Sequence, residues 1–319
     1  MRTAAFCGVL SIAFLLCGCG AVEAGENTRM WFNRCTAHYG RVDEDLGDFI
    51  ASARPQVAIC GHFGPGYWAA VDYAREKDRE FFWTSLGGGP VDRKWWKNFI
   101  SRAHRNGVKV VGIFSLSCTY GHREESKGFF RFYSDHWPED VLGERPEVGA
   151  ADLLQRGADG KLIAQRMYRI EGGTEYFGCP SNPQWREVLK KMARAGIKQG
   201  LDGYIVTFPK RFNCLCEHCR EGFRRWLGER WTATELREKF GIEDLPTHTF
   251  ESINGWYEME EASPYALECL KFTQSTLKNC FDKVLVEDAR RLKPDLLLGQ
   301  WNHIYRSSYT GPGQLAGTF

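Results

Sequence analysis

Three cysteines stand close together at Cys214, Cys216 and Cys219, in the segment CLCEHC, directly after a short apolar run. Thiolates at this spacing can share one metal ion, and zinc is bound by four ligands in a tetrahedron, at about 2.3 Å from each sulfur. The segment therefore supplies three ligands, and a fourth has to come from another part of the chain. The alternative is a disulfide with one free thiol, which is natural in an exported chain.

Residues 1–24 are predicted to be an export signal. Arg2 is followed by a mostly apolar run that is too short, and too soon followed by polar residues, to be a membrane span. Cleavage after Ala24 is one expected outcome, and a lipoprotein with lipid attached at Cys19 is the other. The protein is therefore expected to be secreted or periplasmic, with residues 25–28 as a short linker.

The composition of the 319 residues is that of an ordinary globular chain, with 43% hydrophobic and 26% charged residues and a formal net charge of +2. This balance implies neither a nucleic acid nor an anionic membrane as a partner. Of the 12 cysteines, three lie within the predicted signal and nine beyond it, and an odd number cannot all pair within one chain. The cysteine count therefore argues against a plain disulfide framework.

Short apolar runs alternate with amphipathic helical segments along the chain. Helices between apolar strands predict a parallel sheet, and no glycine-rich phosphate loop follows a strand to favour a dinucleotide-binding fold. We therefore expect an α/β protein of the (β/α) TIM-barrel type. The expected strands cover approximately residues 29–33, 56–63, 108–115, 203–208 and 296–301.

Three long helices are expected between these strands, at about 91–107, 184–200 and 264–292. Asn182 precedes the second helix as a cap residue, and Pro183 occupies its first turn. A closed barrel needs eight strands, whereas this chain supplies about five, so residues 29–319 are expected to be the N-terminal part of an incomplete barrel. We expect a further C-terminal portion or an oligomer to cover the exposed strand edges.

Two motifs carry a resemblance to a known family. The segment CPSNPQWR begins at Cys179, and after a helix and a strand it is followed by CLCEHCREGFRRWLGERW. This arrangement, over about residues 179–240, resembles the family 42 glycoside hydrolases, which are β-galactosidases, and their uncharacterised barrel relatives. The resemblance implies a structural zinc that holds the loop 209–240 beside the active-site mouth. Its ligands would be Cys179, Cys214, Cys216 and Cys219.

The same resemblance implies a carbohydrate-active, glycoside hydrolase-like protein, but the catalytic residues stay unassigned. Such enzymes place a general acid Glu at the end of strand four and a nucleophilic Glu at the end of strand seven. This chain reads TFPKR at the end of strand four and has no predicted strand seven. Asp135 and Glu175, in aromatic segments expected to be loops near the rim, are the candidate acids; the alternative is that each is a solvated loop charge.

The alternative function is a non-catalytic carbohydrate-binding or structural barrel that has lost the strand-four acid. A zinc-dependent hydrolase is disfavoured, because four thiolates leave no open position for water. Aromatic, histidine and basic residues near the expected strand ends suit sugar stacking and hydroxyl binding, although each could equally pack in the core or rim. The substrate-binding candidates are His38, Tyr39, His62, Trp68, Tyr120, Lys210, Arg211 and His303.

Lys210 and Arg211 stand where the related enzymes carry an acid. A guanidinium beside an ammonium suits a carboxylate or a sulfate, which predicts an acidic glycan as the ligand. The alternative is that both side chains face solvent, because consecutive side chains seldom converge on one point.

Overall fold

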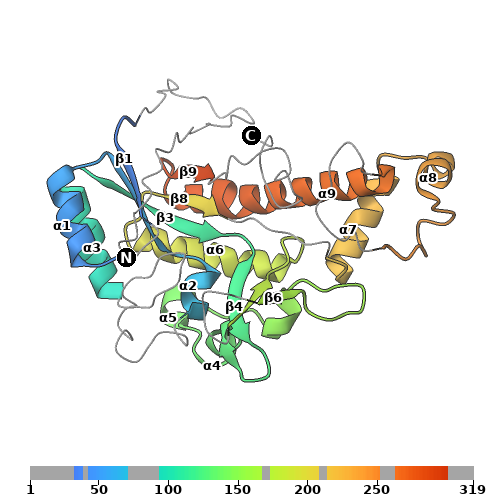
Figure 1. Ribbon diagram of the computed structural model, residues 1–319, viewed down its shortest axis with the longest axis horizontal. Helices are drawn as coiled ribbons and strands as arrows, with labels where there is room; N and C mark the ends of the chain where they lie inside the picture. Colours follow the sequence, from blue (N-terminus) through green and yellow to red (C-terminus); the bar gives the residue numbers. More distant parts are fainter. Residues whose placement is uncertain are drawn as a thin grey trace, which may run out of the picture.

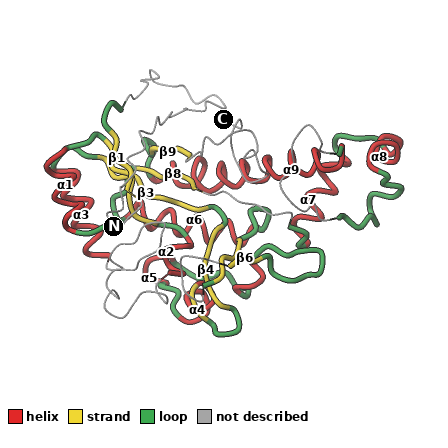
Figure 2. Tube along the Cα trace, in the orientation of Figure 1, coloured by secondary structure: helices red, strands yellow, loops and turns green. Residues whose placement is uncertain are grey.

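The computed structural model describes residues 32–38, 42–70, 93–166, 173–207, 214–251 and 263–300. The predicted export signal and linker lie outside them. Two sheets dominate the described part, one parallel and one antiparallel, with helices packed beside them (Figures 1 and 2).

The larger sheet has five strands, and every neighbouring pair in it is parallel. This confirms the predicted α/β class and the incomplete barrel. In their order across the sheet, the strands are β1 (Cys35–His38), β2 (Val57–His62), β3 (Lys109–Ser115), β8 (Gly203–Thr207) and β9 (Leu297–Gln300).

Of the predicted first strand at residues 29–33, the structure describes only residues 32 and 33, and neither lies in a strand. Strand β1 begins at Cys35, two residues after the predicted end. The backbone N–H groups of Asn33 and Arg34 donate to the side-chain oxygen of Gln56, at 2.6 and 3.2 Å. A side chain therefore takes the amide of Asn33, where a strand would use a backbone carbonyl. The apolar Met-Trp-Phe run that suggested a strand lies just before this point.

Side chains of the parallel sheet alternate between two apolar layers, as parallel strands covered on both faces require. On the outer face, Ala58, Val110 and Tyr204 join the main core with Trp96 and Trp185 of the covering helices. On the inner face, a smaller cluster forms from Val57, Ile59, Val111, Ile113, Ile205 and Leu297.

Helices cover the outer layer, and all of them except α1 lie in the expected places. Asn182 caps the helix after it as predicted, since its side-chain oxygen accepts from the N–H groups of Gln184 and Trp185. The last long helix changes to a π-helical pattern before it ends. The helices are α1 (Glu44–Ala53), α3 (Arg93–Arg105), α6 (Pro183–Lys198), α9 (Pro264–Phe281), its π-helical continuation η4 (Asp282–Ala289) and α10 (Arg290–Leu292).

A four-stranded antiparallel sheet, which the sequence analysis did not predict, lies between β3 and α6 in the chain. Because it follows the carboxyl end of β3, it stands at the rim where barrel enzymes place their functional loops. In sheet order its strands are β5 (Lys127–Gly128), β4 (Cys118–His122), β7 (Thr174–Phe177) and β6 (Ala164–Arg166). The short helices of this insertion are α4 (Phe129–Asp135), α5 (Glu139–Leu142) and η3 (Ala150–Leu153).

A helical arm follows β8, formed by α7 (Glu217–Gly228), α8 (Ala233–Phe240) and the start of α9 (Figure 1). It has its own core, in which Phe223 and Leu227 pack with Phe272. The interpretation of 209–240 as a loop is therefore wrong over α7 and α8. Among the described residues, none of the helices is long and apolar enough to cross a membrane.

Candidate metal centre and strand-end rim

The four predicted cysteine ligands come together in the structure. The Sγ atom of Cys179 lies 3.4 Å from that of Cys219, 3.6 Å from that of Cys216 and 3.9 Å from that of Cys214. A disulfide would require about 2.05 Å, whereas four sulfurs about 2.3 Å from one tetrahedral zinc lie about 3.8 Å apart. All four are free thiols, and their sulfurs lie within 4.8 Å of one another. The group can therefore hold one metal ion.

Three chain segments position these sulfurs. Cys179 follows β7, and its backbone N–H donates to the carbonyl of Leu153 at 2.9 Å. The sulfur of Cys214 accepts from the backbone N–H of Arg156 at 3.4 Å, and the N–H of Leu215 donates to the Arg156 carbonyl at 2.8 Å. A bound metal would therefore tie the arm to the antiparallel insertion.

Helix α7 supplies the remaining two sulfurs. Cys216 is its N-cap residue and Cys219 lies in its first turn. The sulfur of Cys219 also lies 3.3 Å from the hydroxyl oxygen of Ser181, in the segment after Cys179. The positive end of the helix dipole favours the negative charge of thiolates at this end.

The four neighbouring thiols shift one another's pKa values. Hydrogen bonds with the other three thiols, together with burial, raise the pKa of Cys179 well above its usual range. Burial is the main cause of the raised pKa of Cys214, whereas hydrogen bonds from Cys179 and Cys214 lower the pKa of Cys216. The unliganded cluster therefore retains protons, and a metal ion that binds there displaces them.

Two of the aromatic rim candidates contribute to packing. Trp68 lies in helix α2 (Pro65–Ala70) and stacks on Phe132 of α4, with ring centroids 5.3 Å apart. Tyr120 lies in β4 and is 2% exposed. Burial, followed by the charges of Cys118 and Glu175, raises the pKa of Tyr120 well above its usual range, so its hydroxyl stays protonated.

The two candidate acids differ in burial. Asp135 is the last residue of α4 and is exposed, whereas Glu175 lies in β7 and is 6% exposed. The expected loop position is therefore wrong for both, because α4 and β7 include them. The Glu175 carboxylate accepts a hydrogen bond from the Gln165 amide of β6, and in the sheet ladder Glu175 pairs with Tyr120. A buried carboxylate is costly without such partners.

Of the remaining candidates, only His62 has a side chain among the described residues. His62 is the last residue of β2. The side chain of His38 and the whole of Tyr39, Lys210, Arg211 and His303 lie outside the described residues. Their proposed contacts with substrate stay predictions.

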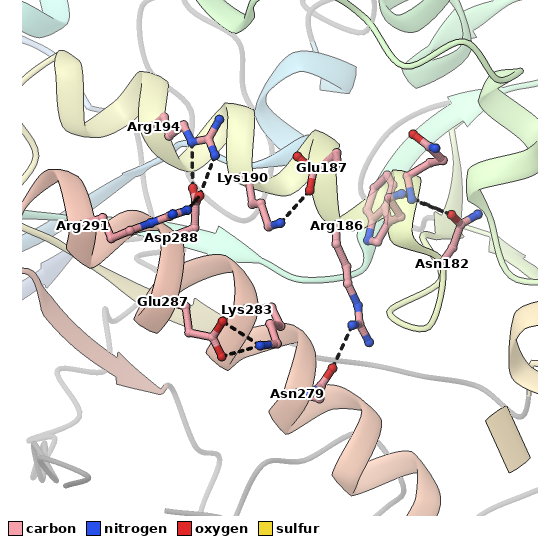
Figure 3. Close-up of polar contacts among 12 residues, drawn as sticks. Asn182, Arg186, Glu187, Lys190, Arg194, Asn279, Lys283, Glu287, Asp288 and Arg291 are labelled. Atoms are coloured by element: carbon pink, nitrogen blue, oxygen red, sulfur yellow. Dashed lines mark hydrogen bonds and ion pairs between the residues drawn. The ribbon is translucent and has the colours of Figure 1, made fainter. Parts of the chain in front are cut away.

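An ion pair between α6 and η4, in which the carboxylate is buried and the arginine is partly exposed, was missed by the sequence analysis (Figure 3). The carboxylate of Asp288 accepts from Arg194 Nε at 2.7 Å and from Arg291 at 2.6 Å. Nearby, Arg186 donates to the Asn279 side chain at 2.8 Å. Arg194 and Asp288 are 94 residues apart in the chain, so no local sequence pattern predicts the pair. These contacts hold the helix before β8 against the helix before β9.

The described part is thus an incomplete parallel (β/α) barrel with four clustered cysteines, one before and three after its fourth strand. Curated relatives share part of its sequence. The β-galactosidase bgaB of Geobacillus kaustophilus is 27% identical over 180 residues, which are 49% of this chain and 26% of that protein. The β-galactosidase BglY of Alicyclobacillus acidocaldarius is 23% identical over 266 residues, or 74% of this chain and 34% of that protein.

These matches span about a quarter to a third of the length of the curated relatives. Among solved structures, the α-L-fucosidase isoenzyme 2 of Paenibacillus thiaminolyticus matches 85% of this chain and 32% of its own chain, at 10% identity and a TM-score of 0.39. No protein-family model matches the chain.

Proposed function

We propose that this chain is a carbohydrate-active, glycoside hydrolase-like barrel protein that is exported and carries one structural zinc. The observation that supports this most is the four-cysteine cluster, built from the motifs on either side of the fourth barrel strand. The matched relatives are named β-galactosidases, which makes a β-galactoside the first substrate to test.

The zinc in this proposal has a structural role. Four thiolates complete its tetrahedron, so it offers no position to a water or a substrate. Its contribution is to hold the arm against the antiparallel insertion at the rim of the barrel. The residues that would bind it are Cys179, Cys214, Cys216 and Cys219.

A non-catalytic carbohydrate-binding or structural barrel is the second candidate, and one observation favours it. A retaining glycosidase needs two carboxyl groups about 5–5.5 Å apart at the reacting bond. None of the five described strands of the parallel sheet ends in a carboxylate. Their last residues are His38, His62, Ser115, Thr207 and Gln300.

Hydrolysis and binding assays on the natural full-length protein distinguish the two candidates. Release of p-nitrophenol from a panel of aryl glycosides, including the β-galactoside, is the expected result for the enzyme. Binding of oligosaccharides without any hydrolysis would select the second candidate. A protein that neither cleaves nor binds any member of the panel would contradict both.

The charge of the glycan is a separate part of the proposal. Lys210 and Arg211 are the basis for expecting an acidic ligand, through charge-assisted hydrogen bonds to a carboxylate or sulfate. Matched neutral and anionic oligosaccharides should differ in affinity at low salt, and Lys210→Ala with Arg211→Ala should remove the difference. Equal affinity for both classes would leave a neutral glycan as the ligand.

A further inference from the structure

The side chain of His62 lies on an unexpected face of the sheet for its place in strand β2. In this strand Val57 and Ile59 face the inner apolar layer, whereas Ala58 and Cys60 face the outer core. Side chains of a regular strand alternate between the two faces, so residue 62 would face outward with Cys60. The structure places it differently.

A β-bulge at Cys60 and Gly61 reverses the alternation. Ile59 pairs with Val111 of β3, but the next pair is His62 with Ile113, so three steps along β2 match two along β3. A bulge of this kind redirects the side chain that follows it. His62 therefore lies on the inner face, beside Ile113.

The neighbouring residues are adapted to the bulge. Gly61 has φ +75°, and a Cβ at this position would collide with the indole of Trp96. Phe63, which would face inward in a regular strand, instead joins the outer core, with its ring centroid 4.9 Å from that of Trp96. Gly112 makes room for it, because a Cβ there would lie 2.7 Å from the Phe63 ring. Packing on the outer face of the sheet thus stabilises the bulge.

His62 is placed like a group that meets a ligand. It stands above the inner layer of Val57 and Ile59, at the carboxyl end of a barrel strand, which is where barrel enzymes bind substrates. Its Nε2 is buried and has no hydrogen-bond partner among the described residues. A buried polar atom without a partner lowers stability, so its retention calls for an explanation.

The protonation state of the ring also suits a ligand with hydroxyl groups. Burial lowers the pKa of His62 to about 4, so the imidazole is neutral near pH 7. A neutral imidazole has one nitrogen that donates and one that accepts, and a hydroxyl group can serve either.

We propose that His62 is a substrate-binding residue, whose imidazole hydrogen-bonds a hydroxyl group of a carbohydrate at the mouth of the barrel. This inference rests on the proposed carbohydrate function. The bulge at Gly61 is the device that turns the ring from the outer core to the inner face.

Variants of the full-length protein test the contact. His62→Leu removes both nitrogens, and we expect its KM for p-nitrophenyl β-galactoside, or its Kd for galactose, to rise about tenfold, the value of one net hydrogen bond. His62→Gln retains a donor and an acceptor and should recover part of this loss. The control is His104→Gln. His104 Nε2 lies 2.7 Å from Asp202, which directly precedes β8 and so stands at the amino end of that strand. The control variant should therefore leave KM and Kd unchanged.

A spectroscopic measurement on the unmodified protein keeps the test independent of folding and hydrolysis. The ¹⁵N resonances of the His62 ring should shift when galactose is added, and those of His104 should not. Shifted resonances in a protein that cleaves no glycoside would refute the hydrolase but support the His62 contact. An active or sugar-binding protein with unshifted His62 resonances, or unchanged KM and Kd in His62→Leu, would overturn the inference. A protein that binds no sugar would overturn it as well.

Discussion

The parallel sheet and the helical arm depend on different forces. The sheet lies between two apolar layers, and the outer one continues into the helices and the antiparallel insertion. The arm has a small core around Phe223, Leu227 and Phe272, and it meets the insertion at the four cysteines. Small cores bury too little apolar surface to be stable without help from metals or crosslinks. We infer that apolar burial holds the sheet, whereas the arm depends on the proposed metal.

Removal of the metal should have the largest effect of all and should be confined to the arm. Cys219→Ser, or a strong chelator, is expected to cost several kcal/mol, because the binding free energy of a structural zinc is also folding free energy. Hydrogen exchange should accelerate in α7 and α8 and change little in β2 and β3. Zinc content, measured by elemental analysis of protein purified without added metal, should fall from one per chain.

The matched control is Cys280→Ser, which alters a buried cysteine outside the cluster and should leave the zinc content unchanged. Uniform acceleration of exchange in both regions would show that arm and sheet unfold together. Disulfides among the four sulfurs, identified by mass spectrometry, would contradict the metal centre itself.

Trp185→Ala should destabilise the sheet region by about 3–5 kcal/mol, as large truncations in cores do. Trp185 is fully buried, and its indole N–H donates to the Leu116 carbonyl at 2.8 Å. Urea unfolding of the full-length protein measures the loss. The control, Phe49→Ala, removes a ring that is 52% exposed and should change stability by less than about 0.5 kcal/mol. Similar losses in the two variants would contradict the assignment of the core.

Asp288→Asn should cost roughly 2 kcal/mol, since Arg194 and Arg291 lose a buried carboxylate but remain partly solvated. Burial opposes the charge of Asp288, yet hydrogen bonds from the two arginines outweigh it and lower its pKa. This contribution is complete above the unfolded pKa of about 4 and is lost as the pH falls through the lower folded value.

Unfolding free energies of Asp288→Asn and the unmodified protein should therefore converge as the solution is acidified from neutral pH. Asp282→Asn is the control, because Asp282 pairs with Lys278 where both side chains are partly exposed, and its loss should cost at most about 0.5 kcal/mol. A difference that stays constant down to pH 2 would contradict the role of the ionised Asp288.

Thr232→Ala should have the smallest effect, about 1 kcal/mol, and only on the arm. Thr232 caps α8 through its side chain, and Glu235 completes the capping box. Hydrogen exchange in α8 should accelerate, whereas exchange in the sheet should not. The control is Thr234→Ala, an exposed position of the same helix, which should be neutral or slightly stabilising. Equal effects of the two variants would exclude the cap as the cause.

Local patterns in the sequence were enough to predict much of the parallel sheet. The second to fifth strands lie within one residue of their expected positions, because short apolar runs bounded by helices carry their own signal. The cap at Asn182 was likewise predictable, since it depends on neighbours in the chain. The three cysteines of CLCEHC are close in sequence, and a family resemblance identified the fourth.

Contacts between distant residues explain what the sequence alone did not show. The antiparallel sheet depends on the pairing of β4 with β7. These two strands are short and lie about 50 residues apart in the chain. That pairing buries Glu175, for which a solvated loop charge was the alternative to a candidate acid. The ion pair of Asp288 likewise could not be predicted from local sequence, because its partner Arg194 lies on another helix.

The sequence by itself determined the class of fold, the positions of four parallel strands and the cysteines that can bind a metal. Only the tertiary structure decided which way His62 faces. A period of two along β2 predicts the outer face, but packing of Trp96 and Phe63 around Gly61 inserts one residue and reverses it. The face to which a side chain points depends on the register of its strand, and here contacts with the neighbouring strand and helix decide the register together with the strand's own Gly61.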